Sequence, residues 1–341
     1  MEAMMSSGRM QMAPLYRLLA AEIVSEAFNL ARNELWTQIR SGTVNPVALP
    51  GVQDQAGFAP TKIDTVMDSF IAARVAEYAP GATYWSEESP RNTYPQDGDI
   101  IAWADPLDGT TNTFTFFSGY AAVLYFDRFA NGHYDHLAGA IAAADGSILS
   151  WQHYRGHGEV FVNWPSDMAW PGLRSPHTAD EGSPPATRTL EIIPNAAPDH
   201  ALQPGEVRSH SGVASRIASV ATTNTRFHDL NQLFDLRQDD SDDKQSRTML
   251  ATTAGNPLGA ALLLGQLGAI VETRPVKLHD AAYLLPLALL GGIVVNPLDW
   301  QPIDVLQRFA QTPLHNRHIG PFVAATDIEA VNWLSKRRRG N

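Results

Sequence analysis

The chain has 341 residues, of which 44% are hydrophobic and 18% are charged, and its formal net charge is −11. The length suits one large domain or two ordinary ones, and the apolar content is sufficient for a substantial core. The acidic balance argues against a nucleic-acid-binding platform, and the absence of cysteine excludes disulfides, thiolate metal sites and a cysteine nucleophile.

The first half of the chain is predicted to begin with two amphipathic helices, at 14–36 and 61–78, because apolar residues recur there at helical spacing. Short strands are expected at 84–85 and 99–104. Four further apolar segments, separated by turn signals, predict an antiparallel meander. These segments are 121–129, 136–144, 147–153 and 159–163.

Residues 164–187 are rich in Pro, Ser, Gly and Asp and are predicted to form a surface insertion. Strand and helix candidates alternate after it, which is an α/β pattern. They are 190–193, 211–220, 258–264, 269–271, 281–290 and 293–295. Pro286 implies a kinked or shortened helix. We therefore expect an α+β half at 1–188 and an α/β half at 189–341.

A pair of aspartates follows the apolar strand 99–104. Asp105 and Asp108, with the Leu107 carbonyl between them, offer the oxygen ligands that hard cations such as Mg²⁺ prefer. Gly109 and Thr110 open the next turn, where backbone N–H groups could hold an anion. An Asp-Pro-x-Asp-Gly fragment alone is equally typical of a solvated turn.

The full segment at 104–112, Ala-Asp-Pro-Leu-Asp-Gly-Thr-Thr-Asn, is more specific and resembles the signature of the inositol monophosphatase family. This family comprises Mg²⁺-dependent, lithium-sensitive phosphatases and includes fructose-1,6-bisphosphatase and bisphosphate nucleotidase. Three further stretches resemble family motifs in the same order, at 61–65, 85–89 and 278–282. The sequence departs from the family at His279, where Trp is usual. The likeness covers about residues 15–323, and it is specific at the acidic motifs and thin in the second half.

The resemblance implies a centre that binds two or three Mg²⁺ ions. Its ligands would be Glu87, Asp105, the Leu107 carbonyl, Asp108 and Asp280. One ion would lie on Glu87, Asp105 and Leu107, and a second on Asp105, Asp108 and Asp280. A Glu-Glu pair alone is typical of a solvated turn, and Asp280 alone of a helix cap, so both assignments depend on the match.

The family pattern also implies roles for residues beside the metals. Asp64 and Thr110 would orient and activate the attacking water, and Glu87 would share in catalysis; the alternative for Asp64 is a helix cap. The backbone at Gly109 and Thr110 would hold the phosphate. Glu272 is a weaker candidate for substrate contact, because it lies one residue too far from Asp280 for the family spacing.

The expected protein is a layered α/β/α/β/α sandwich that hydrolyses a small phosphate monoester as a homodimer. The substrate is left open among inositol phosphates, bisphosphorylated nucleotides, fructose 1,6-bisphosphate and histidinol phosphate. A cytoplasmic location without nucleic-acid or membrane partners is expected, because neither a signal peptide nor a long apolar span is predicted. The alternative is a regulatory binding protein with a vestigial metal site, which the basic run 336–339 could serve.

Overall fold

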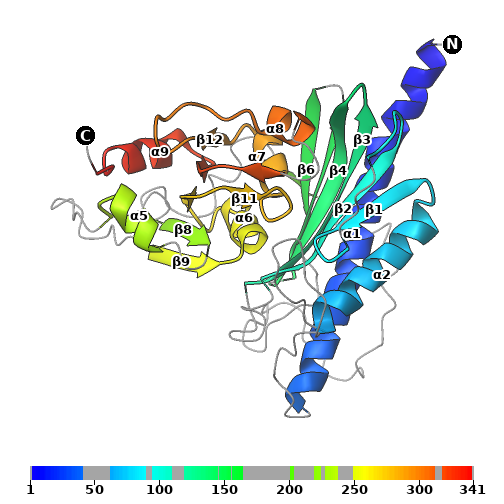
Figure 1. The fold of residues 1–341 in the computed structure, drawn as a ribbon, viewed down its shortest axis with the longest axis horizontal. Coiled ribbons are helices and arrows are strands. Elements are labelled where there is room, and N and C mark those ends of the chain that lie inside the picture. Colours follow the sequence, from blue (N-terminus) through cyan, green and yellow to red (C-terminus); the bar gives the residue numbers. More distant parts are fainter. Residues whose placement is uncertain are drawn as a thin grey trace.

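The computed structural model describes residues 2–40, 62–89, 94–109, 119–144, 146–154, 156–163, 200–202, 219–223, 227–236, 249–311 and 317–339. Thr110, the predicted insertion 164–187 and the predicted strand 190–193 lie outside the described residues. The described elements form five layers, in which helices and sheets alternate (Figure 1). This arrangement is the α/β/α/β/α sandwich that the sequence resemblance implied.

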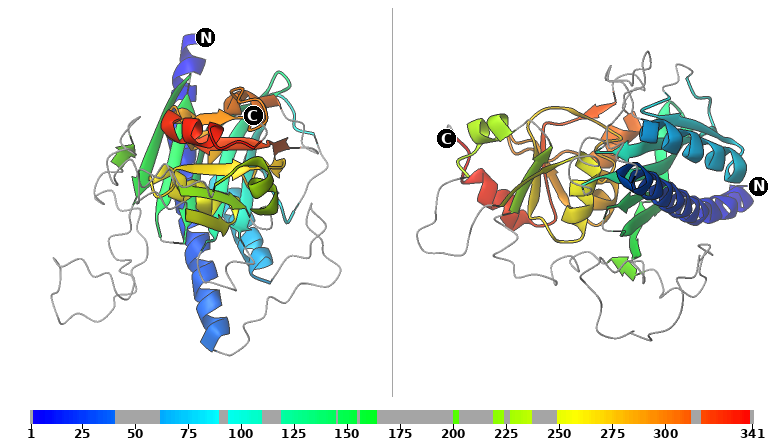
Figure 2. Two further views of the ribbon diagram at one scale, coloured as in Figure 1. Left: turned by 90° about the vertical axis from the view of Figure 1, so that its left-hand side faces the viewer. Right: turned by 90° about the horizontal axis from the view of Figure 1, so that it is seen from below.

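Two long helices form the first layer and cover the outer face of the larger sheet (Figures 1 and 2). They are α1 (Glu2–Arg40) and α2 (Lys62–Tyr78). Buried apolar side chains recur at four-residue spacing, as with Ile23 and Ala27 on α1 and Ile63 and Met67 on α2. The observed α1 is longer than the predicted 14–36 and includes Pro14. In the described part of the chain, no helix is both long and apolar enough to span a membrane.

The larger sheet has seven strands whose spatial order follows the sequence. They are β1 (Ala82–Ser86), β2 (Ile100–Asp108), β3 (Ala121–Ala130), β4 (His133–Ala143), β5 (Ile148–Tyr154), β6 (His157–Asn163) and β7 (His200–Leu202). β1 is parallel to β2, and all later neighbours are antiparallel, which confirms the predicted meander. All of β2 is buried, because helices pack on both faces of the sheet.

The third layer lies between the two sheets and contains three short helices. They are α6 (Gly255–Leu263), α7 (Leu284–Leu289) and α8 (Val305–Gln311). Pro286 is the third residue of α7, within the first turn, where a missing backbone N–H costs no helical hydrogen bond. The helix predicted at 281–290 is therefore shortened, as the proline implied.

The second sheet has the order β12-β14-β10-β8-β9. Its strands are β8 (Ser219–Thr223), β9 (Met249–Thr253), β10 (Ala269–Glu272), β12 (Ile293–Val295) and β14 (Phe322–Ala325). A separate pair joins β11 (Val276–Lys277) to β13 (His318–Ile319). The last layer holds α5 (Phe227–Leu233) and α9 (Ile328–Ser335), which pack on this sheet's other face.

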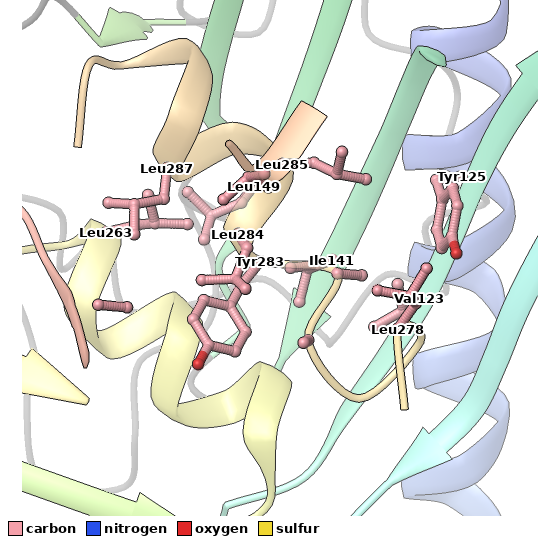
Figure 3. Close-up of a cluster of buried hydrophobic side chains, with 14 of the residues drawn as sticks. Val123, Tyr125, Ile141, Leu149, Leu263, Leu278, Tyr283, Leu284, Leu285 and Leu287 are labelled. Carbon is pink, nitrogen blue, oxygen red and sulfur yellow. The ribbon is translucent and has the colours of Figure 1, made fainter. Parts of the chain in front are cut away.

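The largest hydrophobic cluster joins the larger sheet to the middle helices. In Figure 3, Leu149 of β5 lies beside Leu285 and Leu287 of α7, and Val123 of β3 lies beside Leu278 of the turn before α7. This packing fixes the chain before α7 against the sheet. It thereby brings residues 278–283 close to the end of β2.

Candidate metal centre

The end of β2 is irregular at the two aspartates of the motif. The pairing of β2 with β3 shifts there, because Asp105 lies opposite Val123 while Asp108 lies opposite Ala121. Proline is tolerated at such a bulge since no ladder N–H is required. The strand then turns at Gly109, where φ is +92° and a Cβ atom would approach the Gly119 carbonyl oxygen to 2.5 Å. The bulge and the glycine together end β2 immediately after Asp108.

Glu87 is positioned by β1, which ends one residue before it. Ser86 pairs with Ala104, so Glu87 emerges next to Asp105. The buried Asp68 of α2 holds this turn by accepting hydrogen bonds from Tyr84 Oη at 2.7 Å, Ser86 Oγ at 2.5 Å and Ser89 Oγ at 2.6 Å. Asp68 therefore fixes the backbone on both sides of Glu87.

The third segment of the centre is the turn 278–283, which Asn256 connects to β2. The backbone N–H of Asn256 donates to Asp108 Oδ2 at 2.6 Å, and its side-chain Nδ2 donates to the His279 carbonyl at 2.7 Å. Its Oδ1 accepts from the Tyr283 N–H at 3.2 Å. The neighbouring Gly255 allows this contact, since a Cβ there would meet the Asp280 carbonyl oxygen at 2.1 Å.

Four side chains converge where these segments meet. One donor atom each from Glu87, Asp105, His279 and Asp280 lies within 4.8 Å of all the others. Asp105 is only 2% exposed, and its Oδ2 atom has no hydrogen-bond partner among the described residues. A buried carboxylate oxygen without a donor is costly unless a cation compensates its charge. The donor set therefore fits a divalent metal ion.

Two basic side chains contact the same carboxylates. Lys277 Nζ lies 2.5 Å from Glu87 Oε1. His279 Nε2 lies 3.5 Å from Glu87 Oε2 and 3.4 Å from Asp280 Oδ1. Burial alone would raise the pKa of Glu87, but the charges of His279 and Lys277 outweigh burial and hold that pKa well below its usual range. Burial would lower the pKa of His279, yet Asp280 and Glu87 raise it.

The pKa values of the two aspartates of the motif shift in the opposite direction to that of Glu87. Burial raises the pKa of Asp105 well above its usual value, and the charges of Asp108 and Glu87 raise it further. Burial also raises the pKa of Asp108, and the charge of Asp280 adds to this effect. Asp105 and Asp108 therefore oppose ionisation without a cation, and a bound divalent ion would reverse that preference.

Four of the predicted site residues lie in the cluster or next to it. Glu87, Asp105 and Asp280 are brought together in the cluster. Asp108, next to it, accepts a hydrogen bond from the Asn256 N–H, and burial and the charge of Asp280 both raise its pKa.

The other predicted site residues are not members of the four-residue group. Leu107 is buried in β2, and Asp64 is buried in the first turn of α2, after the helix has begun. Glu272 is buried on β10, outside the four-residue group, where its charge contributes, after burial, to raising the pKa of Tyr283. Thr110 lies outside the described residues.

Sequence reasoning missed four residues of this arrangement: Asp68, Asn256, Lys277 and His279 in the role of a cluster member. Asp68 follows Asp64 by one helical turn, which places both on one face of α2. Asn256 is a lone amide at the start of an apolar helix, a position at which a buried polar group requires specific partners. Both patterns are visible in the sequence but identify no partner.

No protein-family model matches the chain, and no match was found among curated proteins. Solved structures do share its fold. Inositol monophosphatase II of Staphylococcus aureus is 13% identical with a TM-score of 0.52, and the alignment covers 93% of this chain and 92% of that chain. The Thermotoga maritima inositol monophosphatase is 15% identical with a TM-score of 0.51, covering 93% and 95%. SuhB of Mycobacterium tuberculosis is 17% identical with a TM-score of 0.50, covering 94% and 95%. The chain has the inositol monophosphatase fold, as its motifs implied.

Proposed function

We propose that this chain is a divalent-cation-dependent phosphatase that hydrolyses a small phosphate monoester. The observation that carries the proposal is the buried, unpartnered Oδ2 of Asp105 within a group of carboxylates from β1, β2 and the turn before α7. The family motifs supply the reaction class. The fold shared with inositol monophosphatases is consistent with it.

The cations would be held by the residues that the motifs predict: Glu87, Asp105, the Leu107 carbonyl, Asp108 and Asp280. Bound divalent ions favour deprotonation of water and offset the charge of a phosphate. The positive charge of the cations is needed to attract an anionic phosphate, because the chain is acidic overall, with a formal net charge of −11. We propose that the centre binds two or three Mg²⁺ ions.

The remaining residues would position the reactants. Asp64 and Thr110 would orient and activate the attacking water. The backbone at Gly109 and Thr110 would hold the phosphate, and the φ of +92° at Gly109 favours glycine at this turn. Glu272 is a weaker candidate for substrate contact, since its side chain is buried on β10 and lies outside the four-residue group.

Phosphate release tests the proposal directly. Inositol phosphates, fructose 1,6-bisphosphate, 3′-phosphoadenosine 5′-phosphate and histidinol phosphate would each be assayed with a divalent cation and with EDTA. Release that requires the cation is expected from at least one of them. Asp108→Asn should lower that activity by about 100-fold or more, whereas the exposed Asp135→Asn should not change it.

Other outcomes separate the alternatives. A folded protein that binds metal but releases no phosphate from any substrate would refute the phosphatase and favour the regulatory binding protein. Inhibition of the activity by Li⁺ and a homodimeric mass in light scattering remain predictions of the resemblance. A monomeric, lithium-insensitive enzyme would contradict those two predictions and leave the reaction intact.

A further inference from the structure

His279 differs from the carboxylates of the centre in its chemistry. Its side chain is 15% exposed, and its Nε2 atom is buried with no hydrogen-bond partner in the part of the chain that the structure describes. The ring belongs to the same four-residue group as Glu87, Asp105 and Asp280. A nitrogen donor is therefore directed at the proposed metal position.

The distances around His279 Nε2 fit a metal ion shared with the carboxylates better than a direct hydrogen bond to them. Nε2 is 3.5 Å from Glu87 Oε2 and 3.4 Å from Asp280 Oδ1. These separations exceed the roughly 2.7–3.2 Å of a well-formed hydrogen bond. Two donors at about 2.1 Å from one ion lie about 3.0 Å apart in a right-angled arrangement and about 3.4 Å apart in a tetrahedral one. The nitrogen and the two oxygens are thus spaced for a shared ion.

The neighbouring contacts hold His279 and Glu87 in this orientation. Asn256 Nδ2 donates to the His279 carbonyl at 2.7 Å and fixes the backbone from which the ring extends. Lys277 Nζ binds Glu87 Oε1 at 2.5 Å, so the second oxygen, Oε2, is the one that faces His279. Glu87 is therefore presented through a single oxygen.

We propose that His279 is a metal ligand and that the position it completes prefers a divalent transition-metal ion such as Mn²⁺ to Mg²⁺. This inference rests on the metal centre of the proposed function. Mg²⁺ takes oxygen ligands and keeps several waters, whereas imidazole nitrogen adds affinity for first-row transition metals. One nitrogen ligand among three carboxylates increases the affinity of this position for transition-metal ions relative to Mg²⁺. A site built of oxygen ligands alone would not show this preference.

Mn²⁺ is the probe, because its binding and its ligands can both be read by electron paramagnetic resonance. The metal-free 341-residue chain would be titrated with Mn²⁺ alone and then with Mg²⁺ as competitor. Pulsed measurements on bound Mn²⁺ should show nitrogen coupling from a coordinated imidazole. Incorporating ¹⁵N-histidine should change that coupling. Mn²⁺ should bind at least about tenfold more tightly than Mg²⁺.

Substitution assigns the coupling to this residue. His279→Trp places the family residue at the position, and His279→Ala serves as a second variant. Both should lose the nitrogen coupling and lower Mn²⁺ affinity by about tenfold or more, while Mg²⁺ affinity changes less than about threefold. His133→Gln is the matched control. His133 is the exposed first residue of β4 and pairs with Ala130 at one end of β3. Asp108 pairs with Ala121 at the opposite end of β3.

The outcomes separate this inference from the phosphatase. Failure to bind Mn²⁺, Mn²⁺ bound without histidine nitrogen coupling, or equal loss of Mn²⁺ and Mg²⁺ affinity in folded variants would overturn the role of His279. If neither variant folds, the ¹⁵N-histidine measurement on the wild-type chain decides. Cation-dependent phosphate release without nitrogen coupling would leave the proposed function standing. Histidine nitrogen coupling in a protein that releases no phosphate would support His279 as a metal ligand and would refute the phosphatase activity.

Discussion

Replacing Asn256 by alanine tests whether the link between α6 and the turn 278–283 holds the centre together. Asn256 is fully buried, and its side chain bonds the His279 carbonyl and the Tyr283 N–H. The variant removes both partners but keeps the backbone N–H that bonds Asp108. Each unsatisfied buried backbone group costs about 1–3 kcal/mol, so the loss of both partners should lower the free energy of unfolding by about 2–6 kcal/mol.

The same substitution should weaken metal binding, because the turn that carries His279 and Asp280 would lose its two side-chain anchors. Outer-shell substitutions typically lower metal affinity by about 10–100-fold, and we expect a loss in that range. Urea unfolding of the metal-free chain would give the stability change, and Mn²⁺ titration the affinity change.

Asn332 of α9 provides the matched control, since it is exposed and lies on the last layer. Asn332→Ala should change the free energy of unfolding by less than about 0.5 kcal/mol and leave metal binding intact. If Asn256→Ala also stayed within about 0.5 kcal/mol and bound metal normally, the link would not position the centre.

Further substitutions and conditions test the other supports of the site. Asp68→Asn should weaken metal binding by about tenfold through the turn that carries Glu87, and unchanged Mn²⁺ titration would count against this. Gly255→Ala should lower both stability and metal affinity, because its Cβ would meet the Asp280 carbonyl oxygen at 2.1 Å; Gly81→Ala, which has open space around it, is the control. Without metal, the free energy of unfolding should fall as pH rises above the ordinary aspartate pKa of 3.8, because Asp105 and Asp108 have raised pKa values in the folded state and retain protons that the unfolded chain loses. The lowered pKa of Glu87 acts in the opposite sense, but only below its ordinary value of 4.5. Saturating Mn²⁺ should remove the dependence above pH 3.8, and an identical pH profile with and without metal would contradict the electrostatic argument.

The first half of the fold was predictable because its elements are long and periodic. The predicted helix 61–78 and the four-strand meander correspond closely to α2 and to β3–β6. The extension of α1 to residue 2 was not predicted, since no apolar periodicity precedes Pro14. In the second half, strands such as β14 have four residues. Short strands depend on pairing with distant partners, and periodicity cannot reveal that pairing.

The candidate site shows a similar division between local and distant information. The motif at 104–112 indicated Asp105 and Asp108 because the whole segment resembles the inositol monophosphatase signature, whereas its Asp-Pro-x-Asp-Gly fragment alone is equally typical of a solvated turn. The supporting residues could not be found in this way. Asn256 acts on Asp108 from 148 positions away, and Lys277 acts on Glu87 from 190 positions away. Such roles emerge only when the sheet and the middle helices pack together.

The chemistry of the centre depends on this separation of its parts. Asp105 and Asp108 belong to a rigid, fully buried strand, whereas His279 and Asp280 belong to a turn held by Asn256 and by the packing of α7. Each group alone is a collection of buried charges with raised or lowered pKa values. Their approach concentrates negative charge at one point, and the fold retains this arrangement although it opposes stability without a cation. A site that is costly to the metal-free protein and supported from several layers is best explained by a requirement for the ion, and His279 is the residue that we propose selects which ion binds.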